Sequence, residues 1–240
     1  MQKFKFVTAF LFLTILKLEA IDSSYKFEGL FGSPVENINN LNQHAQSFLP
    51  YNAVIVEVGA YRGEGTIQLS GAYPYGKIYA FEPLPDNYSV LINRAGQCKN
   101  VSLCNLALST SDNMIRLWGD GSQASLFSQE KEGEKWIEVP CILLDKWCKL
   151  NDIDHIDFLR LDIGGCEWQI INSSPEILKT VIVLVIKTHI QPSNPSIPSY
   201  NVIKKSLDDL GFELFSHWYQ EGNEGEATFV RKYMYDSIFR

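Results

Sequence analysis

The sequence predicts an α/β fold, in which a mostly parallel, doubly wound sheet carries helices on both faces and ends in an antiparallel strand pair. Short apolar segments alternate with segments of helical character between residues 53 and 210. Segment 181–186 is almost wholly apolar, which is typical of a strand buried on both sheet faces. With 240 residues, 45% of them hydrophobic, the chain can form one large domain, which we expect over residues 51–240.

The first part of this domain is expected to contain strands at 53–58, 77–81 and 101–105. A glycine-rich turn at 59–65 follows the first strand and leads into a helix that reaches about residue 71. Pro85 fits the first turn of the next helix. Backbone N–H groups in that turn have no partner within the helix, so the N–H group that proline lacks is not missed.

The second part continues the alternation. Strand-like segments at 114–118 and 137–143 flank a loop rich in glycine and serine, and a short helix follows at 145–150. A buried strand at 156–161 precedes a helix at 166–172, and the apolar strand 181–186 precedes a helix at 201–210. Gly211 is placed to end that helix. Segments 213–218 and 227–231 are expected to form the closing antiparallel pair.

The N-terminal residues 1–20 have the form of a signal peptide. Lys3 and Lys5 precede an apolar run at 6–16, and Ala20 offers a small residue for cleavage. The run is short for a transmembrane helix. We therefore expect an exported or membrane-associated protein, with an uncleaved anchor or a cytoplasmic extension as alternatives. Residues 21–50 are expected to be a polar lead-in with a short helix at 35–48.

Composition limits the partners. The formal net charge is −7 and no basic stripe with interleaved aromatic residues is present, which argues against nucleic acid. A small-molecule or glycan-like ligand is the expected partner, and membrane contact is expected only through the leader. The cysteines form no CxxC pair and predict free thiols rather than a zinc site or a disulfide framework.

Ligands of open parallel sheets bind beyond the carboxyl ends of the strands, which directs attention to the loops that follow them. Gly59 and Gly63 allow a tight turn and a close backbone approach to a ligand. Glu57, at the end of its strand, is placed to hold a cofactor's amino group, Glu82 suits ribose hydroxyls, and Asn105 is placed beside an adenine pocket. The glycine spacing is not GxGxxG, so a pyrophosphate-binding loop is a poorer match. The alternative is that these glycines and Asn105 only turn the chain.

Several segments occur in the order seen in FkbM-type methyltransferases, and together they cover roughly residues 53–190. They are 57–63, 81–83, 105–107, 124–126, 143–145, 157–167 and 183–189. The resemblance implies a Rossmann-like class I methyltransferase fold, S-adenosyl-L-methionine as cofactor, and methylation of hydroxyl groups. It makes Glu57, Gly59, Gly63 and Glu82 cofactor-site candidates. It also implies that Asp162 and Glu167 line or support the acceptor side and that His189 lies near it.

The chain departs from this family at two positions. Members commonly have Asp-Val-Glu-Gly-Ala-Glu where residues 162–167 here include Gly164, and Glu-Ile-His where Lys187 begins the corresponding triplet. Methyl transfer to oxygen needs in-line placement and removal of one proton. His189 is our general-base candidate because an unperturbed histidine titrates near pH ~6.5; a structural histidine is the alternative. Asp162, Glu167 and His189 have no metal-ligand spacing, so no metal is expected.

We therefore expect an S-adenosylmethionine-dependent methyltransferase that acts on a hydroxyl of a sugar or small-molecule acceptor. A catalytically silent exported member that binds a ligand or partner is the main alternative, favoured by the leader, Gly164 and Lys187. A nicotinamide-dependent oxidoreductase is disfavoured by the spacing of Gly59 and Gly63.

Overall fold

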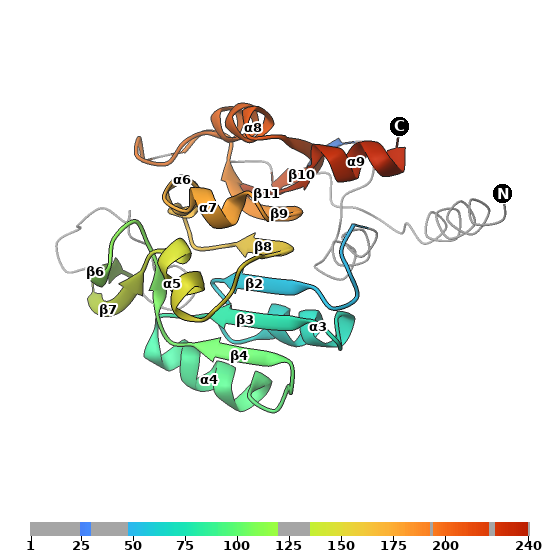
Figure 1. The fold of residues 1–240 in the computed structure, drawn as a ribbon. Coiled ribbons are helices and arrows are strands. Elements are labelled where there is room, and N and C mark those ends of the chain that lie inside the picture. The colour runs from blue at the N-terminus through green and yellow to red at the C-terminus, as the bar shows by residue number, and fades with distance from the viewer. Residues whose placement is uncertain (1–24, 30–47, 120–134, 193, 221–223, 240) are drawn as a thin grey trace.

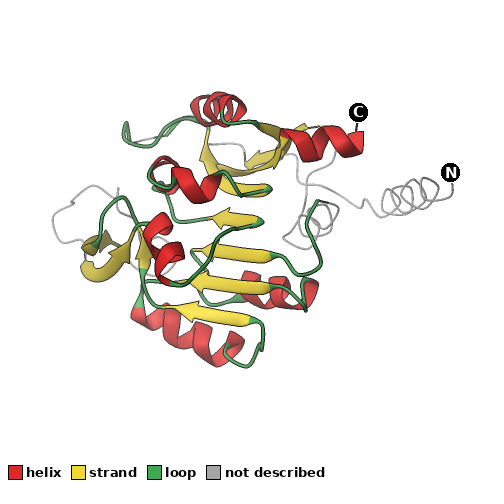
Figure 2. Ribbon diagram, in the orientation of Figure 1, coloured by secondary structure: helices red, strands yellow, loops and turns green. Residues whose placement is uncertain are grey.

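A computed structural model describes residues 25–29, 48–119, 135–192, 194–220 and 224–239. Within these residues, eight strands form one sheet with the order β1-β10-β11-β9-β8-β2-β3-β4. Helices cover both faces of the sheet, as Figures 1 and 2 show. The predicted α/β class, with a mostly parallel sheet and antiparallel strands at its C-terminal end, is confirmed.

The parallel part of the sheet positions the site. Its strands are β2 (Val54–Val58), β3 (Lys77–Phe81), β4 (Val101–Cys104), β8 (Phe158–Leu161) and β9 (Val183–His189). Val58, the last residue of β2, is in register with Phe81 of β3 and with Leu161 of β8. Because these strands run in the same direction, their carboxyl ends meet at one edge of the sheet.

The antiparallel part follows the predicted pairing. Strands β10 (Phe212–Gln220) and β11 (Glu224–Arg231) pair with each other, and β11 also pairs with β9. Strand β1 (Tyr25–Gly29) lies at the sheet edge against β10, within the segment expected to be a polar lead-in. The signal-like leader at 1–20 and residues 35–47 of the expected lead-in helix lie outside the described residues. Among the helices described, none combines the length and apolar character needed to cross a bilayer.

Most of the described helices connect strands, and the last of these helices follows the final strand. The helices are α3 (Glu64–Ala72), α4 (Pro85–Ala95), α5 (Leu144–Leu150), α6 (Glu167–Asn172), α7 (Pro175–Leu178), α8 (Tyr200–Asp209) and α9 (Lys232–Phe239). Pro85 opens α4 as predicted. Gly211 follows α8 with φ 83°, a conformation that suits glycine at a helix end. Helices α7 and α9 were not predicted.

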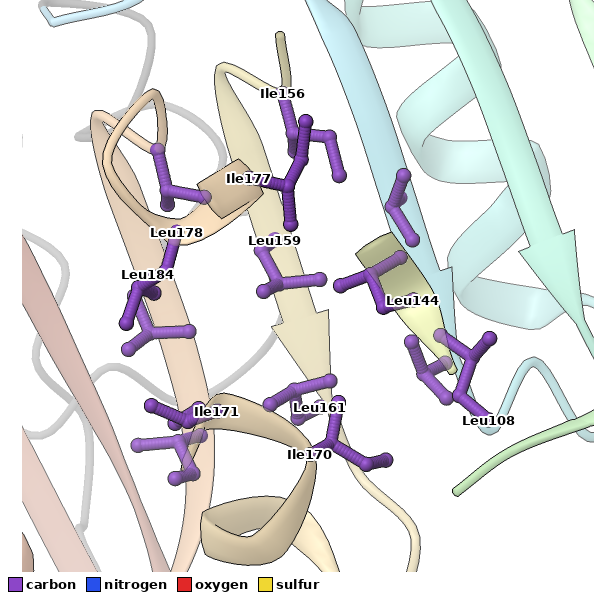
Figure 3. Close-up of a cluster of buried hydrophobic side chains, with 14 of the residues drawn as sticks. Leu108, Leu144, Ile156, Leu159, Leu161, Ile170, Ile171, Ile177, Leu178 and Leu184 are labelled. Atoms are coloured by element: carbon purple, nitrogen blue, oxygen red, sulfur yellow. The ribbon is translucent and has the colours of Figure 1, made fainter. Parts of the chain in front are cut away.

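The buried side chains of the sheet alternate between its faces. Val56, Leu159 and Leu184 belong to a cluster that also contains residues from α5 to α8. Figure 3 shows part of this cluster, with side chains of β8 and β9 directed toward those of the covering helices. Ile55 and Phe158 point to the opposite face, where residues of α3 and α9 pack. Strands buried on both faces therefore read as continuous apolar runs.

A small separate sheet adjoins the carboxyl ends of the parallel strands (Figure 1). In the described residues it has the order β5-β7-β6, formed by β5 (Ala107–Leu108), β6 (Asn113–Trp118) and β7 (Trp136–Ile142). Segments 114–118 and 137–143 were predicted as strands, and here they pair antiparallel. Residues 120–134, which include segment 124–126 of the family resemblance, lie outside the described residues.

Candidate active site

A cavity of about 360 Å³ opens at the carboxyl ends of the parallel strands. Its described lining comes from the segments that follow β2, β3, β4 and β8, from strand β6, and from Lys187 of β9. Its volume lies within the roughly 300–1,000 Å³ typical of small-molecule sites. This is the position at which open α/β sheets bind their ligands.

The glycine loop after β2 is shaped by two positions with positive φ. Gly59 lines the cavity with φ 88°, and a Cβ atom there would lie 2.1 Å from the carbonyl oxygen of Asp162. Gly63 also has φ 88°, and its Cβ would lie 2.7 Å from Cδ1 of Leu91 on α4. Gly59 therefore lets the ends of β2 and β8 approach closely beside the cavity. Gly63 instead allows the start of α3 to pack closely against Leu91 of α4.

Glu82, directly after β3, lines the cavity and is only 5% exposed. Its Oε2 accepts the backbone N–H of Tyr61 at 2.9 Å, and its Oε1 accepts that of Leu84 at 2.9 Å. Burial raises the pKa of this carboxyl, whereas the hydrogen bonds oppose that shift. A carboxylate offers roughly four lone-pair sites, so Glu82 retains capacity to accept a ligand hydroxyl.

Tyr61 lines the same cavity and was missed by the sequence analysis. It adopts φ 51°, which is uncommon for a residue other than glycine, and the Arg62 guanidinium lies 5.1 Å from the centre of its ring. The Tyr61–Glu82 hydrogen bond links the loop after β2 to the end of β3. In the sequence, only its position inside the glycine loop pointed to a site role for Tyr61. Its residue type did not, because aromatic residues more often pack in cores.

Glu57 and Asn105 do not belong to the described cavity lining. Glu57 is 1% exposed, and its carboxylate accepts the Thr66 hydroxyl at 2.6 Å and Nη1 of Arg160 at 3.3 Å. It therefore joins α3 to the sheet below the glycine loop. The Asn105 amide donates to the backbone oxygens of Glu82 at 2.9 Å and of Pro83 at 3.2 Å, which fixes the chain after β3.

Arg160 forms the centre of a buried charge network that sequence analysis also missed. Its Nη1 bonds Glu57, while its Nη2 bonds Asp162 and Glu226, each at 3.2 Å. The Arg160 side chain is only 12% exposed. Asp162 is 39% exposed and lines the cavity. The network thus connects Asp162 to β2 and to the C-terminal strand β11.

Glu167 shapes the loop after β8. Its Oε1 accepts the N–H of Ile163 at 3.0 Å, and its Oε2 accepts that of Gly165 at 2.8 Å. The side chain is buried, and burial raises its pKa to about 7. Gly164, in the middle of this loop, lines the cavity with φ 73°. Glu167 therefore supports this wall of the cavity from below, and Gly164 places no side chain there, at the position where the family resemblance led us to expect a carboxylate.

Lys187 and His189 lie on the same face of β9. Lys187 lines the cavity, and its Nζ bonds Oε2 of Glu224 at 3.1 Å. Burial opposes the charge of Lys187, but the carboxylates of Asp162 and Glu224 outweigh it and raise the pKa. His189 is 8% exposed and does not belong to the described lining. Burial lowers its pKa, and its Nε2 has no hydrogen-bond partner among the described residues.

The structure thus brings Gly59, Glu82 and Asp162 together around one cavity. Glu57 and Glu167 form hydrogen bonds that hold its walls in place. Gly63, Asn105 and His189 lie outside the described lining. Asp157, which the sequence places at the opposite end of β8, accepts the N–H of Val54 at 2.8 Å, far along the strand from this cavity.

Comparison with known proteins gives one family. The model of the methyltransferase FkbM domain matches residues 57–220. No curated protein matches the chain.

Similar solved structures include the fibrillarin of Aeropyrum pernix with natively bound S-adenosyl-L-methionine, at 14% identity over 76% of this chain and 69% of that one, with a TM-score of 0.45. An rRNA methylase from Streptococcus thermophilus shares 13% identity over 83% of this chain and 99% of that one, with a TM-score of 0.47. The N-terminal domain of EvdMO1, solved in the presence of SAH and D-fucose, shares 12% identity over 96% and 97%, with a TM-score of 0.48.

Proposed function

The chain belongs to the FkbM methyltransferase family, and we propose that it methylates a hydroxyl group of a sugar or another small acceptor, with S-adenosylmethionine as donor. The observation that carries this proposal is the cavity at the carboxyl ends of β2, β3 and β8, which is bordered by Gly59, Glu82 and Asp162. A close backbone approach, a carboxylate for ribose hydroxyls and a polar wall suit the binding of this donor beside an acceptor.

The residues present fit the cofactor. Gly59 exposes backbone to the cavity at a position where any side chain would collide with Asp162. Glu82 is held in place by N–H donors on two loops and by the Asn87 amide at 3.5 Å, and keeps about one of its roughly four lone-pair sites for a ribose hydroxyl. When bound, S-adenosylmethionine supplies an electrophilic methyl group on a positively charged sulfur. The carboxylates of Glu82 and Asp162 favour a cationic ligand in this cavity, whereas the Lys187 ammonium in the same lining opposes one.

The remaining groups suit the acceptor. Asp162 can accept a hydroxyl proton or hydrogen bond, whereas Lys187, held protonated by its carboxylate neighbours, can donate to the acceptor. We propose His189 as the group that removes the acceptor proton: its lowered pKa keeps it neutral near pH 7, and because its buried Nε2 lies outside the described cavity lining, the acceptor must reach past Lys187 to meet it. Loss of an acid at position 164 and gain of a base at 187 still leave a donor and an acceptor at the cavity.

The test is methyl transfer by the full-length chain from methyl-labelled S-adenosylmethionine to hexoses and small phenols, with products analysed by mass spectrometry and NMR. O-methyl products that appear with wild type and decrease with Asp162→Asn would support the proposal. Methylation only at nitrogen or carbon would contradict O-methylation. Cofactor binding without any transfer would favour the silent ligand-binding alternative, to which Gly164 and Lys187 point.

An oxidoreductase is the competing enzyme class. Two pairs, Tyr73 with Lys77 and Tyr200 with Lys204, have the Tyr-x-x-x-Lys spacing found in some nicotinamide-dependent enzymes, and neither Tyr73 nor Lys77 belongs to the described lining of the cavity. However, Tyr200 is 4% exposed, stacks on His217 with ring centres 3.7 Å apart, and neither Tyr200 nor Lys204 belongs to the described lining of the cavity. Their placement therefore offers no support for hydride transfer at this site.

The cellular location remains a proposal from the leader. We propose export or membrane association because Lys3 and Lys5 precede an apolar run in the manner of a signal peptide. Mass spectrometry of the protein from its native cell would show a mature start near Ile21 if the leader is cleaved. An intact Met1 would favour the anchor or cytoplasmic alternatives.

A further inference from the structure

We propose that Glu224 is a positioning residue for His189: it holds Nδ1 of the imidazole protonated and leaves Nε2 as the atom that takes the acceptor's proton. This inference rests on the proposed methyl transfer and adds a residue to it. Glu224 lies in β11, beyond residue 220, where the match to the family ends. The C-terminal hairpin would therefore contribute to the chemistry as well as to the sheet.

The strand pairing brings the two residues together. Glu224 of β11 lies directly opposite His189 of β9, so both side chains project from the same face of the sheet. One carboxylate oxygen, Oε2, binds Nζ of Lys187 at 3.1 Å. The other, Oε1, lies 4.0 Å from Nδ1 of His189. Lys187 thus anchors the carboxylate, and its second oxygen faces the imidazole. At 4.0 Å the two atoms form an ion-pair contact and not a hydrogen bond, so the hydrogen bond forms only when the pair tightens as the acceptor binds.

This geometry selects one form of the imidazole. A neutral histidine has one nitrogen that donates and one that accepts, and its neighbours decide which is which. An ionised carboxylate only accepts, so Glu224 favours the proton on Nδ1. Nε2 then carries the lone pair, and no described residue bonds it in its buried position. Burial, helped by the Lys187 ammonium, lowers the pKa of His189, while Glu224 opposes that shift.

The location suits the acceptor rather than the cofactor. Lys187 lines the cavity, whereas His189 lies outside its described lining, two residues further toward the carboxyl end of the same strand face and about 7 Å along it. Its buried Nε2 therefore meets an acceptor that reaches past Lys187. Strand β8 separates β9 from β2, so His189 is remote from the glycine loop.

The proposed step balances. A methyl–oxygen bond forms as the methyl–sulfur bond of the donor breaks, and the sulfur keeps that electron pair. The acceptor's O–H electrons stay with its oxygen, and the proton moves to Nε2. Glu224 then stabilises the imidazolium that results.

Nitrogen-15 NMR of the full-length chain with labelled histidine tests this placement. The chain has four histidines, and His189→Gln assigns the signal of interest. We expect the Nδ1–H form in wild type. In Glu224→Ala the Nδ1–H preference should be lost and the pKa of His189 should fall further, because the neighbouring negative charge is gone. Glu224 is 59% exposed, so this truncation should leave the fold intact.

Glu138→Ala is the matched control, because it removes a half-exposed glutamate that pairs with Arg116 in the small sheet. It should leave the His189 signal unchanged, and the signals of His155 and His217 report on folding in every variant. An Nε2–H form in wild type, or a His189 signal that Glu224→Ala does not alter, would overturn the inference. The measurement needs neither donor nor acceptor, so its failure is separable from a failure of methyl transfer.

Discussion

Replacing Gly59 by alanine should destabilise the protein substantially at the wall of the cavity. At φ 88° an alanine pays the left-handed penalty of roughly 1–2 kcal/mol. Its Cβ would lie 2.1 Å from the Asp162 carbonyl oxygen and 3.2 Å from Cγ2 of Ile163. The nearer atom is backbone, so the ends of β2 and β8 must separate, which adds overpacking strain of about 1–3 kcal/mol. We expect a loss of about 2–5 kcal/mol from a total stability on the order of 5–15 kcal/mol.

Urea unfolding measures this loss, with Gly71→Ala as the matched control. Gly71 lies in α3 with no atom within 4 Å of an added Cβ. Alanine in a helix is favoured over glycine by roughly 0.5–1 kcal/mol, so this variant should be as stable as wild type or slightly more stable. If Gly59→Ala unfolded within about 0.5 kcal/mol of wild type, the range of neutral surface changes, the tight contact with Asp162 would be refuted.

Three further variants test the site. Glu82→Gln should weaken S-adenosylmethionine binding about ten- to hundredfold in calorimetry, because hydrogen bonds to a charged group contribute ~1.5–3 kcal/mol; an unchanged affinity would remove Glu82 from the cofactor site. Arg160→Met should lose about 3–5 kcal/mol in urea unfolding, because it leaves buried carboxylates uncompensated, whereas the exposed Arg116→Met should lose no more than about 1 kcal/mol; equal losses would contradict a buried network. Burial raises the pKa of Glu167 from 4.5 to about 7, so the stabilisation linked to its proton is present below pH 4.5 and lost as pH rises through about 7. Thermal unfolding should therefore show wild type losing stability relative to Glu167→Gln between those values, and a constant difference would contradict the raised pKa.

The fold was largely predictable because its strands are buried on both faces. Apolar runs such as 181–186 identify strands without alternation, and Gly211 and Pro85 mark helix ends by backbone chemistry alone. Strand pairing was harder to predict from the sequence. The hydrophobic pattern identifies segments 114–118 and 137–143 as strands, but it does not show that they form a sheet separate from the main one. Strand β1 lies at the edge of the sheet. An edge strand needs fewer apolar residues than a central one, so its sequence gives a weaker strand signal.

The site was predictable where backbone geometry or a strand end imposes a residue type. Gly59 and Glu82 were found in that way, Asp162 came from the family resemblance, and all three line the cavity. Arg160 was not, because a cation inside an apolar strand gives no sign of its partners on β2 and β11. Glu57 was expected to face a ligand, but its bonds to Thr66 and Arg160 depend on packing across three elements. Long-range pairing of this kind cannot be read from local sequence.

Calorimetric titration of the folded full-length chain with S-adenosylmethionine, and separately with NAD, tests the central claim most directly. We expect S-adenosylmethionine to bind in the micromolar range with one site per chain, and NAD not to bind. Binding of NAD alone would contradict the assignment of the cavity to a methyl donor. Binding of neither ligand would contradict methyltransferase activity and leave a silent member of the family.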